Sequence, residues 1–251
     1  MASMPLVSPP GFAMQRHRLP IDPFAYAAIY VFALPGLFAA AAFLAQRSGL
    51  DMALARRFYD AASRGFPLRT LPSLELLGHK AILGLPIGIA ALALIALAVA
   101  AFRPALRPWV LPCALLLAAM AAVPLLIAAL KNITALPRPY RLALFGGDLP
   151  MPTHWFAVGG MPAGGALPSH HAAAGYSAGL LYFLGWAMQR PALRWGGLAL
   201  GMVLGILLSS VRIMQGAHFL SQTLWSAALV CLVGALCFLP LAGAPRTLAA
   251  A

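Results

Sequence analysis

Six long apolar runs constrain the fold of this chain more than any other feature. They cover residues 24–45, 81–102, 109–130, 171–188, 195–211 and 219–239. A lipid bilayer offers the backbone no hydrogen-bond partners, so a run of about 20 apolar residues crosses it as a helix. We therefore predict an all-α, polytopic membrane bundle of six transmembrane helices. The fourth and fifth runs, at 18 and 17 residues, lie near the lower limit for crossing.

The composition of the chain excludes a water-soluble fold. Hydrophobic residues make up 62% of the chain and charged residues 9%, with a mean hydropathy of +0.88, which leaves too few polar side chains to cover a water-exposed surface. We divide the chain into a cytoplasmic tail (1–23), a membrane domain (24–240) and a second cytoplasmic tail (241–251). The first run is too long for a cleaved signal peptide and is expected to remain as a span. Helix kinks are expected at Pro35, Pro86, Pro112 and Pro124.

The connections between the runs predict how the bundle is oriented. Residues 103–108 and 189–194 are short, contain arginine and have no acidic residue, which is typical of cytoplasmic loops. Both tails then lie in the cytoplasm, and segments 46–80, 131–170 and 212–218 share the opposite face. Segment 46–80 also carries six basic residues. Its mixture of apolar and basic side chains fits either a helix lying in the membrane interface or a solvated linker.

The net charge of +12 favours anionic partners, either lipid surfaces or anionic substrates. Nucleic acid is disfavoured, because the arginines are scattered over short loops. The three cysteines, Cys113, Cys231 and Cys237, lie inside apolar runs. They indicate neither a disulfide framework nor a metal site.

Two groups of polar residues stand at the borders of apolar runs. Lys131 and Arg138 could clamp a phosphate, although basic residues also anchor helices at membrane interfaces. Ser169 is suited to cap the fourth helix, whose free N–H groups favour an anion. The next two residues, His170 and His171, are either interfacial histidines or part of a site in which His171 protonates a leaving oxygen.

A third group lies between the fifth and sixth runs. Arg212 and His218 flank Gly216, which permits a tight turn. A neutral histidine held in one tautomer can attack phosphorus. Gln222 follows one helical turn later, so its side chain can reach the ring of His218. Without the other two groups, His218 would be interpreted as an interfacial histidine whose ring nitrogens have hydrogen-bond partners.

Together, Lys131-x6-Arg138-Pro139, Pro168-Ser169-x-His171 and Arg212-x5-His218 resemble the three-part signature of the type 2 phosphatidic acid phosphatase superfamily, which is related to vanadium haloperoxidases. The resemblance implies that the phosphoryl oxygens are bound by Lys131, Arg138, Ser169, His170 and Arg212. It also implies that His218 forms a phosphohistidine and that His171 protonates the leaving group. Gln222 would orient His218, and neither a metal nor a cofactor would be needed.

Three positions depart from the pattern of the family. His170 replaces a glycine that lets the backbone approach phosphate, Val211 replaces a serine, and Gln222 replaces an aspartate. A glutamine can orient His218 but supplies no negative charge. Slower catalysis, rescue by another acid such as Asp148, and loss of hydrolysis are the three outcomes left open.

We expect a lipid phosphatase of the bacterial inner membrane with its active site facing the periplasm. Phosphatidic acid, phosphatidylglycerol phosphate, undecaprenyl diphosphate and lipid A phosphates are candidate substrates. The alternatives are a lipid phosphotransferase and a non-catalytic phospholipid-binding or transport protein. A lipid phosphate and membrane lipids are the expected partners, and the oligomeric state is not predicted.

Overall fold

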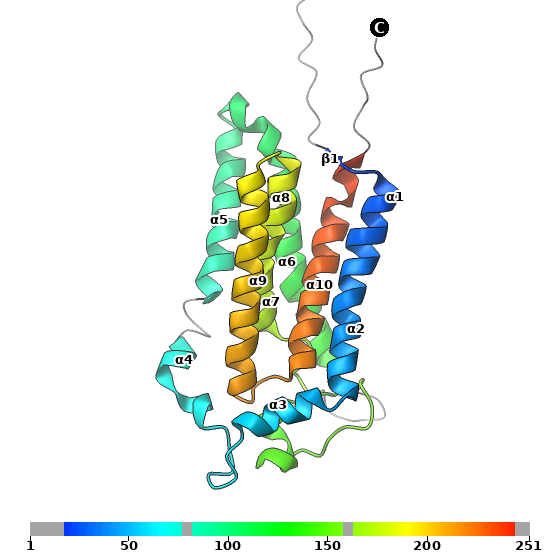
Figure 1. The fold of residues 1–251 in the computed structure, drawn as a ribbon. Coiled ribbons are helices and arrows are strands. Elements are labelled where there is room, and N and C mark those ends of the chain that lie inside the picture. Colours follow the sequence, from blue (N-terminus) through cyan, green and yellow to red (C-terminus); the bar gives the residue numbers. More distant parts are fainter. Residues whose placement is uncertain (1–17, 77–81, 158–162, 244–251) are drawn as a thin grey trace, which may run out of the picture.

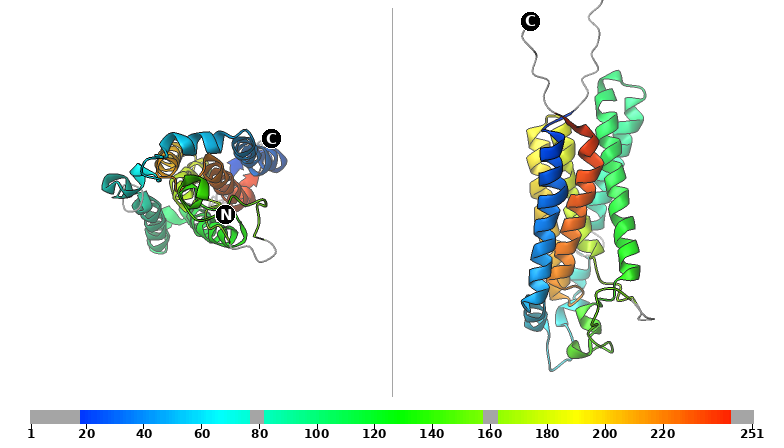
Figure 2. Two further views of the ribbon diagram at one scale, coloured as in Figure 1. Left: turned by 90° about the horizontal axis from the view of Figure 1, so that it is seen from below. Right: turned by 90° about the vertical axis from the view of Figure 1, so that its right-hand side faces the viewer.

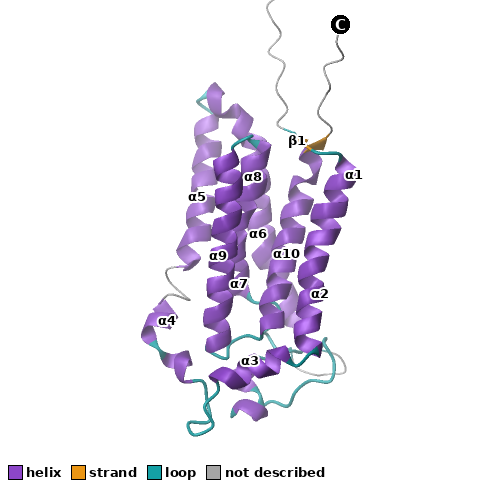
Figure 3. Cartoon of the chain, in the orientation of Figure 1, coloured by secondary structure: helices purple, strands orange, loops and turns teal. Residues whose placement is uncertain are grey.

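The computed structural model describes residues 18–76, 82–157 and 163–243. Long helices run side by side in one elongated bundle (Figures 1 and 3). Residues 1–17 and 244–251 of the expected tails, Lys80, and residues 158–162 of a Gly- and Pro-rich loop lie outside the described residues. The elements in chain order are β1 (Leu19–Pro20), α1 (Pro23–Tyr26), η1 (Ala27–Ala33), α2 (Leu34–Arg47), α3 (Leu50–Phe58), η2 (Pro67–Thr70), α4 (Pro72–Leu76), α5 (Ile82–Ala100), η4 (Pro104–Trp109), α6 (Val110–Ile133), η5 (Pro139–Arg141), η6 (Ala143–Phe145), α7 (His170–Ser177), η7 (Ala178–Leu180), α8 (Leu181–Ala187), α9 (Pro191–Met214), α10 (Leu220–Phe238), η8 (Leu239–Leu241) and β2 (Ala242–Gly243).

The apolar runs form helices, as their length predicts. Within the described ranges, four helical segments are long and apolar enough to cross a membrane: Pro23–Arg47, Pro104–Ile133, Pro191–Met214 and Leu220–Leu241. A shorter apolar helix covers Gly84–Ala100. The fourth run forms α7 and α8 with the 3₁₀ segment η7 between them. The chain is therefore a mostly helical, multi-pass membrane protein, and the count of six spans stays a prediction.

The fifth helix is longer than the sequence analysis predicts. We expected it to begin at residue 195, but α9 begins at Pro191 and has 24 residues. The cause is Pro191 itself, which occupies the first helical turn, where a missing N–H costs nothing. Residues 191–194, assigned to a connecting loop, are thus helical, and Arg194 lies on α9.

The first apolar run contains a π-helical segment, whose turns are wider than those of an α-helix. Residues Ala27–Ala33 form a π-helix directly before Pro35, and the Leu34 N–H donates to the Ile29 carbonyl, five residues back. Because proline has no N–H, the turn before it cannot complete the α-helical hydrogen-bond pattern. The wider turn lets the helix continue through Arg47.

Glycines let α9 pack closely against α7 and α8. Gly197, Gly201 and Gly205 recur every four residues on one face of α9. A Cβ atom at any of them would overlap the neighbouring chain, at Leu181, Gly179 and Tyr176 respectively. Small residues at this spacing allow two helices to approach closely inside a membrane. The position of each end of α9 is therefore determined by α7 and α8.

The two ends of the bundle differ in structure. At one end β1 and β2 pair in parallel, which brings the two ends of the described chain together. At the other end α3 runs across the long helices, and the loops of residues 59–76 and 134–157 gather around it (Figures 1 and 2). A second, smaller apolar core of Ala55, Phe66, Leu142, Phe145 and Phe219 joins these segments to the start of α10. Within segment 46–80, the described residues 46–76 are therefore anchored to this end of the bundle through Ala55 and Phe66.

Candidate active site

The turn between α9 and α10 places Arg212 and His218 beside each other. The backbone N–H groups of Ala217 and His218 both donate to the Arg212 carbonyl, at 2.9 and 3.2 Å. Gly216 makes the turn with φ of +61°, a conformation that favours glycine. A Cβ atom here would also overlap the ring of Phe66. Both constraints require glycine at position 216.

Gln222 holds the ring of His218 in one orientation. The Nδ1 atom of His218 lies 3.0 Å from Oε1 of Gln222, and both side chains are buried. The same oxygen accepts from the Phe219 N–H, while Nε2 of Gln222 donates to the Pro137 carbonyl at 3.2 Å. Since that carbonyl can only accept, the amide is oriented with its oxygen toward the ring. His218 therefore carries its proton on Nδ1 and presents the lone pair of Nε2.

Three cations lie close enough to His218 to affect its pKa. Burial lowers the pKa of its imidazole well below the usual value, and the charge of Lys131 lowers it further. Arg212 and Arg138 act in the same direction, and the hydrogen bond to Gln222 opposes them. The ring is consequently neutral at pH 7, and a neutral imidazole with a free Nε2 is a nucleophile. The three cations, which come from separate stretches of the sequence, form a site suited to an anion.

Neighbouring groups position two of these cations. Nη1 of Arg212 donates to Oε1 of Gln215 at 2.9 Å, and Gln215 is buried. Nη1 of Arg138 donates to the Tyr140 hydroxyl at 2.9 Å. The Tyr140 N–H in turn donates to the Gly216 carbonyl at 3.0 Å, which ties this loop to the turn after α9.

Arg69 packs against Tyr140, the residue that positions Arg138. Its guanidinium carbon lies 3.6 Å from the centre of the Tyr140 ring, a cation–π contact. Neither Gln215 nor Arg69 belongs to the three motifs, and no spacing in the sequence links Arg69 to Tyr140. Both were found only from the fold.

Ser169 caps α7, as predicted, and also joins α7 to α10. Its side chain accepts from the Ala172 N–H at 3.4 Å. Its backbone N–H donates to the Ser226 hydroxyl at 2.8 Å, and that hydroxyl donates back to the Ser169 carbonyl at 3.0 Å. The Ser169 N–H is therefore used by α10, and the phosphate contacts expected from backbone N–H groups near Ser169 do not include it.

His170 and His171 line an apolar groove between α5, α6 and α7. The groove has a volume of about 470 Å³, and its other walls include Ile87 and Met120. Nε2 of His170 lies 3.3 Å from the Pro124 carbonyl. The ring of His170 is thus directed to α6, and the phosphate-binding role expected for it stays a prediction, as does the acid role of His171.

The acid nearest in space to this end of α10 is Asp51, not Asp148. Asp148 is exposed and forms an ion pair with Arg141 at 3.8 Å. Asp51, on α3, is buried and accepts from both the N–H and the hydroxyl of Ser221. Burial raises the pKa of its carboxyl group, and these hydrogen bonds oppose the shift. Rescue of Gln222 by Asp148 therefore has no support in the geometry.

Comparison with known proteins identifies the family to which the chain is similar. A family model described as the PAP2 superfamily matches residues 112–242, which include all three motifs. No curated protein and no solved structure matches the chain significantly. In the described ranges, no group of three or more His, Cys, Asp or Glu side chains is placed to hold a metal ion.

Proposed function

The chain belongs to the PAP2 superfamily, and on that premise we propose that it is a membrane phosphatase that hydrolyses a lipid phosphate or diphosphate through a phosphohistidine. A phosphatase-type activity follows from the family. The observation that carries the finer proposal is the buried His218, with Nδ1 bonded to Gln222 and Nε2 available among Lys131, Arg138 and Arg212.

In the proposed reaction, Nε2 of His218 attacks phosphorus while the bond to the leaving oxygen breaks. Lys131, Arg138 and Arg212 neutralise the charge that spreads over the three equatorial oxygens. His171 donates a proton to the leaving oxygen. A water molecule then attacks the phosphohistidine and gives a proton to His171 while the P–N bond breaks, which releases inorganic phosphate and restores neutral His218. The chain's own residues supply every group in this sequence, so we propose that no metal takes part.

The groove beside His171 supports a lipid as the leaving group. It is lined by apolar residues of α5, α6 and α7 and has both histidines on its wall. A proton donor next to an apolar groove is suited to a leaving oxygen that carries a hydrocarbon chain.

We further propose that the active-site end faces the outside of the cell, in a bacterial inner membrane. The short basic connections 103–108 and 189–194 lie at the opposite end of the bundle (Figure 1), where the positive-inside rule places the cytoplasm. The arginines of segment 46–80 then lie beside the site, where they attract anionic headgroups.

Phosphate release from phosphatidic acid and from a polyprenyl diphosphate, by detergent-purified protein with and without EDTA, tests this function. We expect release that EDTA does not abolish, together with an acid-labile phosphoryl label on the protein. His218→Ala should lose both, whereas His154→Ala, which changes an exposed histidine, should lose neither. Release that survives His218→Ala would exclude the mechanism.

The leaving-group role of His171 has a separate test. His171→Ala should slow hydrolysis of phosphatidic acid by about 10²-fold or more. It should slow hydrolysis of p-nitrophenyl phosphate far less, because nitrophenolate leaves without a proton. Equal losses on both substrates would exclude His171 as the acid.

A non-catalytic phospholipid-binding protein is the second candidate, because Gln222 brings no negative charge to His218. Phosphatidic acid that binds to the purified protein without phosphate release or labelling would favour it. A lipid phosphotransferase would instead pass the label to an added lipid acceptor.

A further inference from the structure

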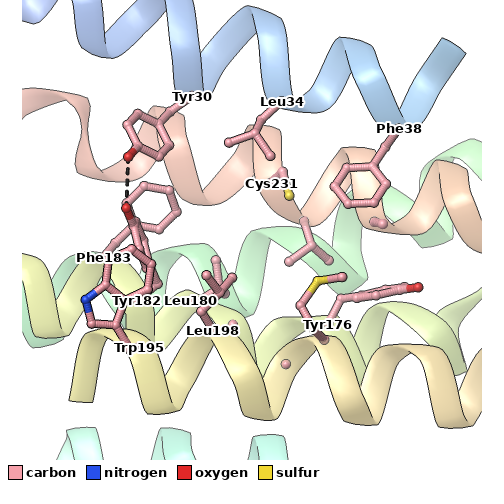
Figure 4. A pocket seen from close by; sticks show the side chains of 15 residues that line it. Tyr30, Leu34, Phe38, Tyr176, Leu180, Tyr182, Phe183, Trp195, Leu198 and Cys231 are labelled. Carbon is pink, nitrogen blue, oxygen red and sulfur yellow. Dashed lines mark hydrogen bonds between the residues drawn. The ribbon is translucent and has the colours of Figure 1, made fainter. Parts of the chain in front are cut away.

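A second apolar groove lies on the side of the bundle between α2 and α9. Its volume is about 210 Å³, and its floor is formed by residues of α8 and α10 (Figure 4). Leu34 and Phe38 project into it from α2, and Leu198 from α9 (Figure 4). It has no residue in common with the groove beside His171. The proposed phosphatase reaction makes no use of this second groove, so its occupant is a separate question.

One end of this groove is polar. The hydroxyl groups of Tyr30 and Tyr182 lie 2.8 Å apart (Figure 4), and Nη2 of Arg194 donates to the Tyr182 hydroxyl at 2.6 Å. The Arg194 guanidinium also lies 4.2 Å from the Trp186 ring centre and 4.9 Å from that of Trp195. Aromatic rings and an arginine at one level of a membrane protein are typical of the boundary between hydrocarbon and headgroups.

Arg194 retains hydrogen-bonding capacity in this setting. Among the described residues, its Nε atom is buried and has no hydrogen-bond partner. A buried donor without an acceptor is unfavourable. Arg190, four residues earlier, is an exposed residue at the N-cap of α9. Asp22, an acid at the same end, is used to cap α1 through the N–H groups of Phe24 and Ala25. This end of the groove therefore favours an added anionic acceptor.

The geometry of α9 places this end at the membrane surface opposite the active site. Arg194 precedes Arg212 by 18 residues, which is about five turns and ~27 Å along the helix axis. That length is close to the ~30 Å thickness of the hydrocarbon core of a bilayer. The backbone of Arg194 is held in place, because a Cβ atom at Gly185 would overlap it.

We propose that this groove binds an anionic phospholipid from the leaflet opposite the active site. One acyl chain lies along Leu34, Phe38 and Leu198, and the phosphate accepts hydrogen bonds from Arg194. A zwitterionic lipid fills the same apolar groove but carries a cation that Arg194 repels. A second copy of the chain, docked here by a two-fold axis normal to the membrane, brings arginines of like charge to the same level, which opposes association.

Quenching of tryptophan fluorescence by brominated acyl chains tests this site, with Trp195 as the reporter. Trp195 lines the groove and is 56% exposed. The full-length protein is reconstituted in phosphatidylcholine vesicles that contain a small fraction of brominated phosphatidylglycerol or of brominated phosphatidylcholine. The Trp195 component is the difference between wild type and Trp195→Phe. We expect phosphatidylglycerol to be preferred by about fivefold, the ratio that ~1 kcal/mol per arginine at a membrane surface provides.

The matched variants are Arg194→Gln and Arg190→Gln, which remove the same charge at the same end of α9. Arg194→Gln should reduce the preference to about onefold, whereas Arg190→Gln, an exposed residue, should keep most of it. Equal quenching by both lipids in the wild type would overturn the proposal. So would loss of the preference in Arg190→Gln but not in Arg194→Gln, since the charge of the surface alone would then explain it. None of these results depends on phosphatase activity, so the two proposals can fail separately.

Discussion

The two ends of α9 each carry an arginine, and the two arginines have different surroundings. Arg212 is buried beside Gln215 and His218, with Lys131 and Arg138 close by. Arg194 lies against aromatic rings and donates to one tyrosine hydroxyl. Clustered cations repel one another and therefore favour a strongly charged anion, whereas aromatic faces stabilise a single cation where it lies. We infer that the first environment is built for a phosphoryl group that reacts and the second for one that only binds.

Arg212→Lys should reduce activity more than any other change considered, whereas the same change at the other end of α9 should not. A lysine keeps the charge but cannot donate to Gln215 and to two phosphoryl oxygens in one plane. We expect kcat/KM for phosphatidic acid to fall by about 10²-fold. Arg190→Lys, the same change in an exposed residue at the other end of α9, should leave it unchanged. Similar losses of kcat/KM in both variants would mean that the reaction does not depend specifically on the arginine at the His218 end of α9.

Gln222→Glu should change the pH dependence of the reaction. A carboxylate cannot donate to the Pro137 carbonyl, but it stabilises a protonated His218, so it raises the pKa of that ring. In the wild type the pKa of His218 is well below its usual value, and the nucleophile is neutral throughout neutral pH. We expect the acid limb of kcat/KM, measured from pH profiles of phosphate release, to move to higher pH in Gln222→Glu.

The matched control for this change is Gln189→Glu, which alters a glutamine outside the site that bonds only locally, to the Trp186 carbonyl. Its pH profile should coincide with that of the wild type. An unchanged profile in Gln222→Glu would show that the contact between Gln222 and His218 does not control protonation of the nucleophile.

Asp51→Asn should have the smallest effect, and mainly on stability. Asp51 accepts from two donors of Ser221, whereas an asparagine would turn an N–H toward one of them. We expect a loss of about 1–3 kcal/mol, measured by thermal unfolding in detergent at neutral pH. Asp60→Asn, which changes an acid on the same segment whose hydrogen bonds are local, is the control. An equal drop in both variants would show that α3 does not secure the start of α10.

The same neutral histidine predicts how stability changes with pH. The pKa of His218 is lower in the folded protein than in the unfolded chain. The unfolded state therefore binds more protons as the pH falls below about 6.5, so stability is lost on acidification. This loss, measured by thermal unfolding in detergent, should be smaller in His218→Gln, an uncharged replacement at the same position.

Much of the candidate site was predictable from the sequence, because residues three or four positions apart in a helix lie next to each other. The cap of Ser169 and the reach of Gln222 to His218 each involve residues within one helical turn. Contacts over long sequence distances were not predictable. Asp51 meets Ser221 across 170 residues, and nothing in the pattern around either residue indicates the other.

Helix boundaries show a similar limit. Apolar length predicted that α9 exists, but its start at Pro191 depends on capping. The prediction placed Arg194 in a loop, and only the helical assignment aligns it with Arg212 along one helix.

The sequence by itself determined that the chain is a membrane helical bundle and that three motifs supply cations and a histidine, because hydrophobic length and residue chemistry are local properties. The tertiary structure decided how those groups are used. It set the tautomer of His218 through Gln222 and Pro137, turned His170 toward α6 and brought Asp51 to the start of α10. These outcomes depend on which helices pack together, and packing joins residues that no sequence interval relates.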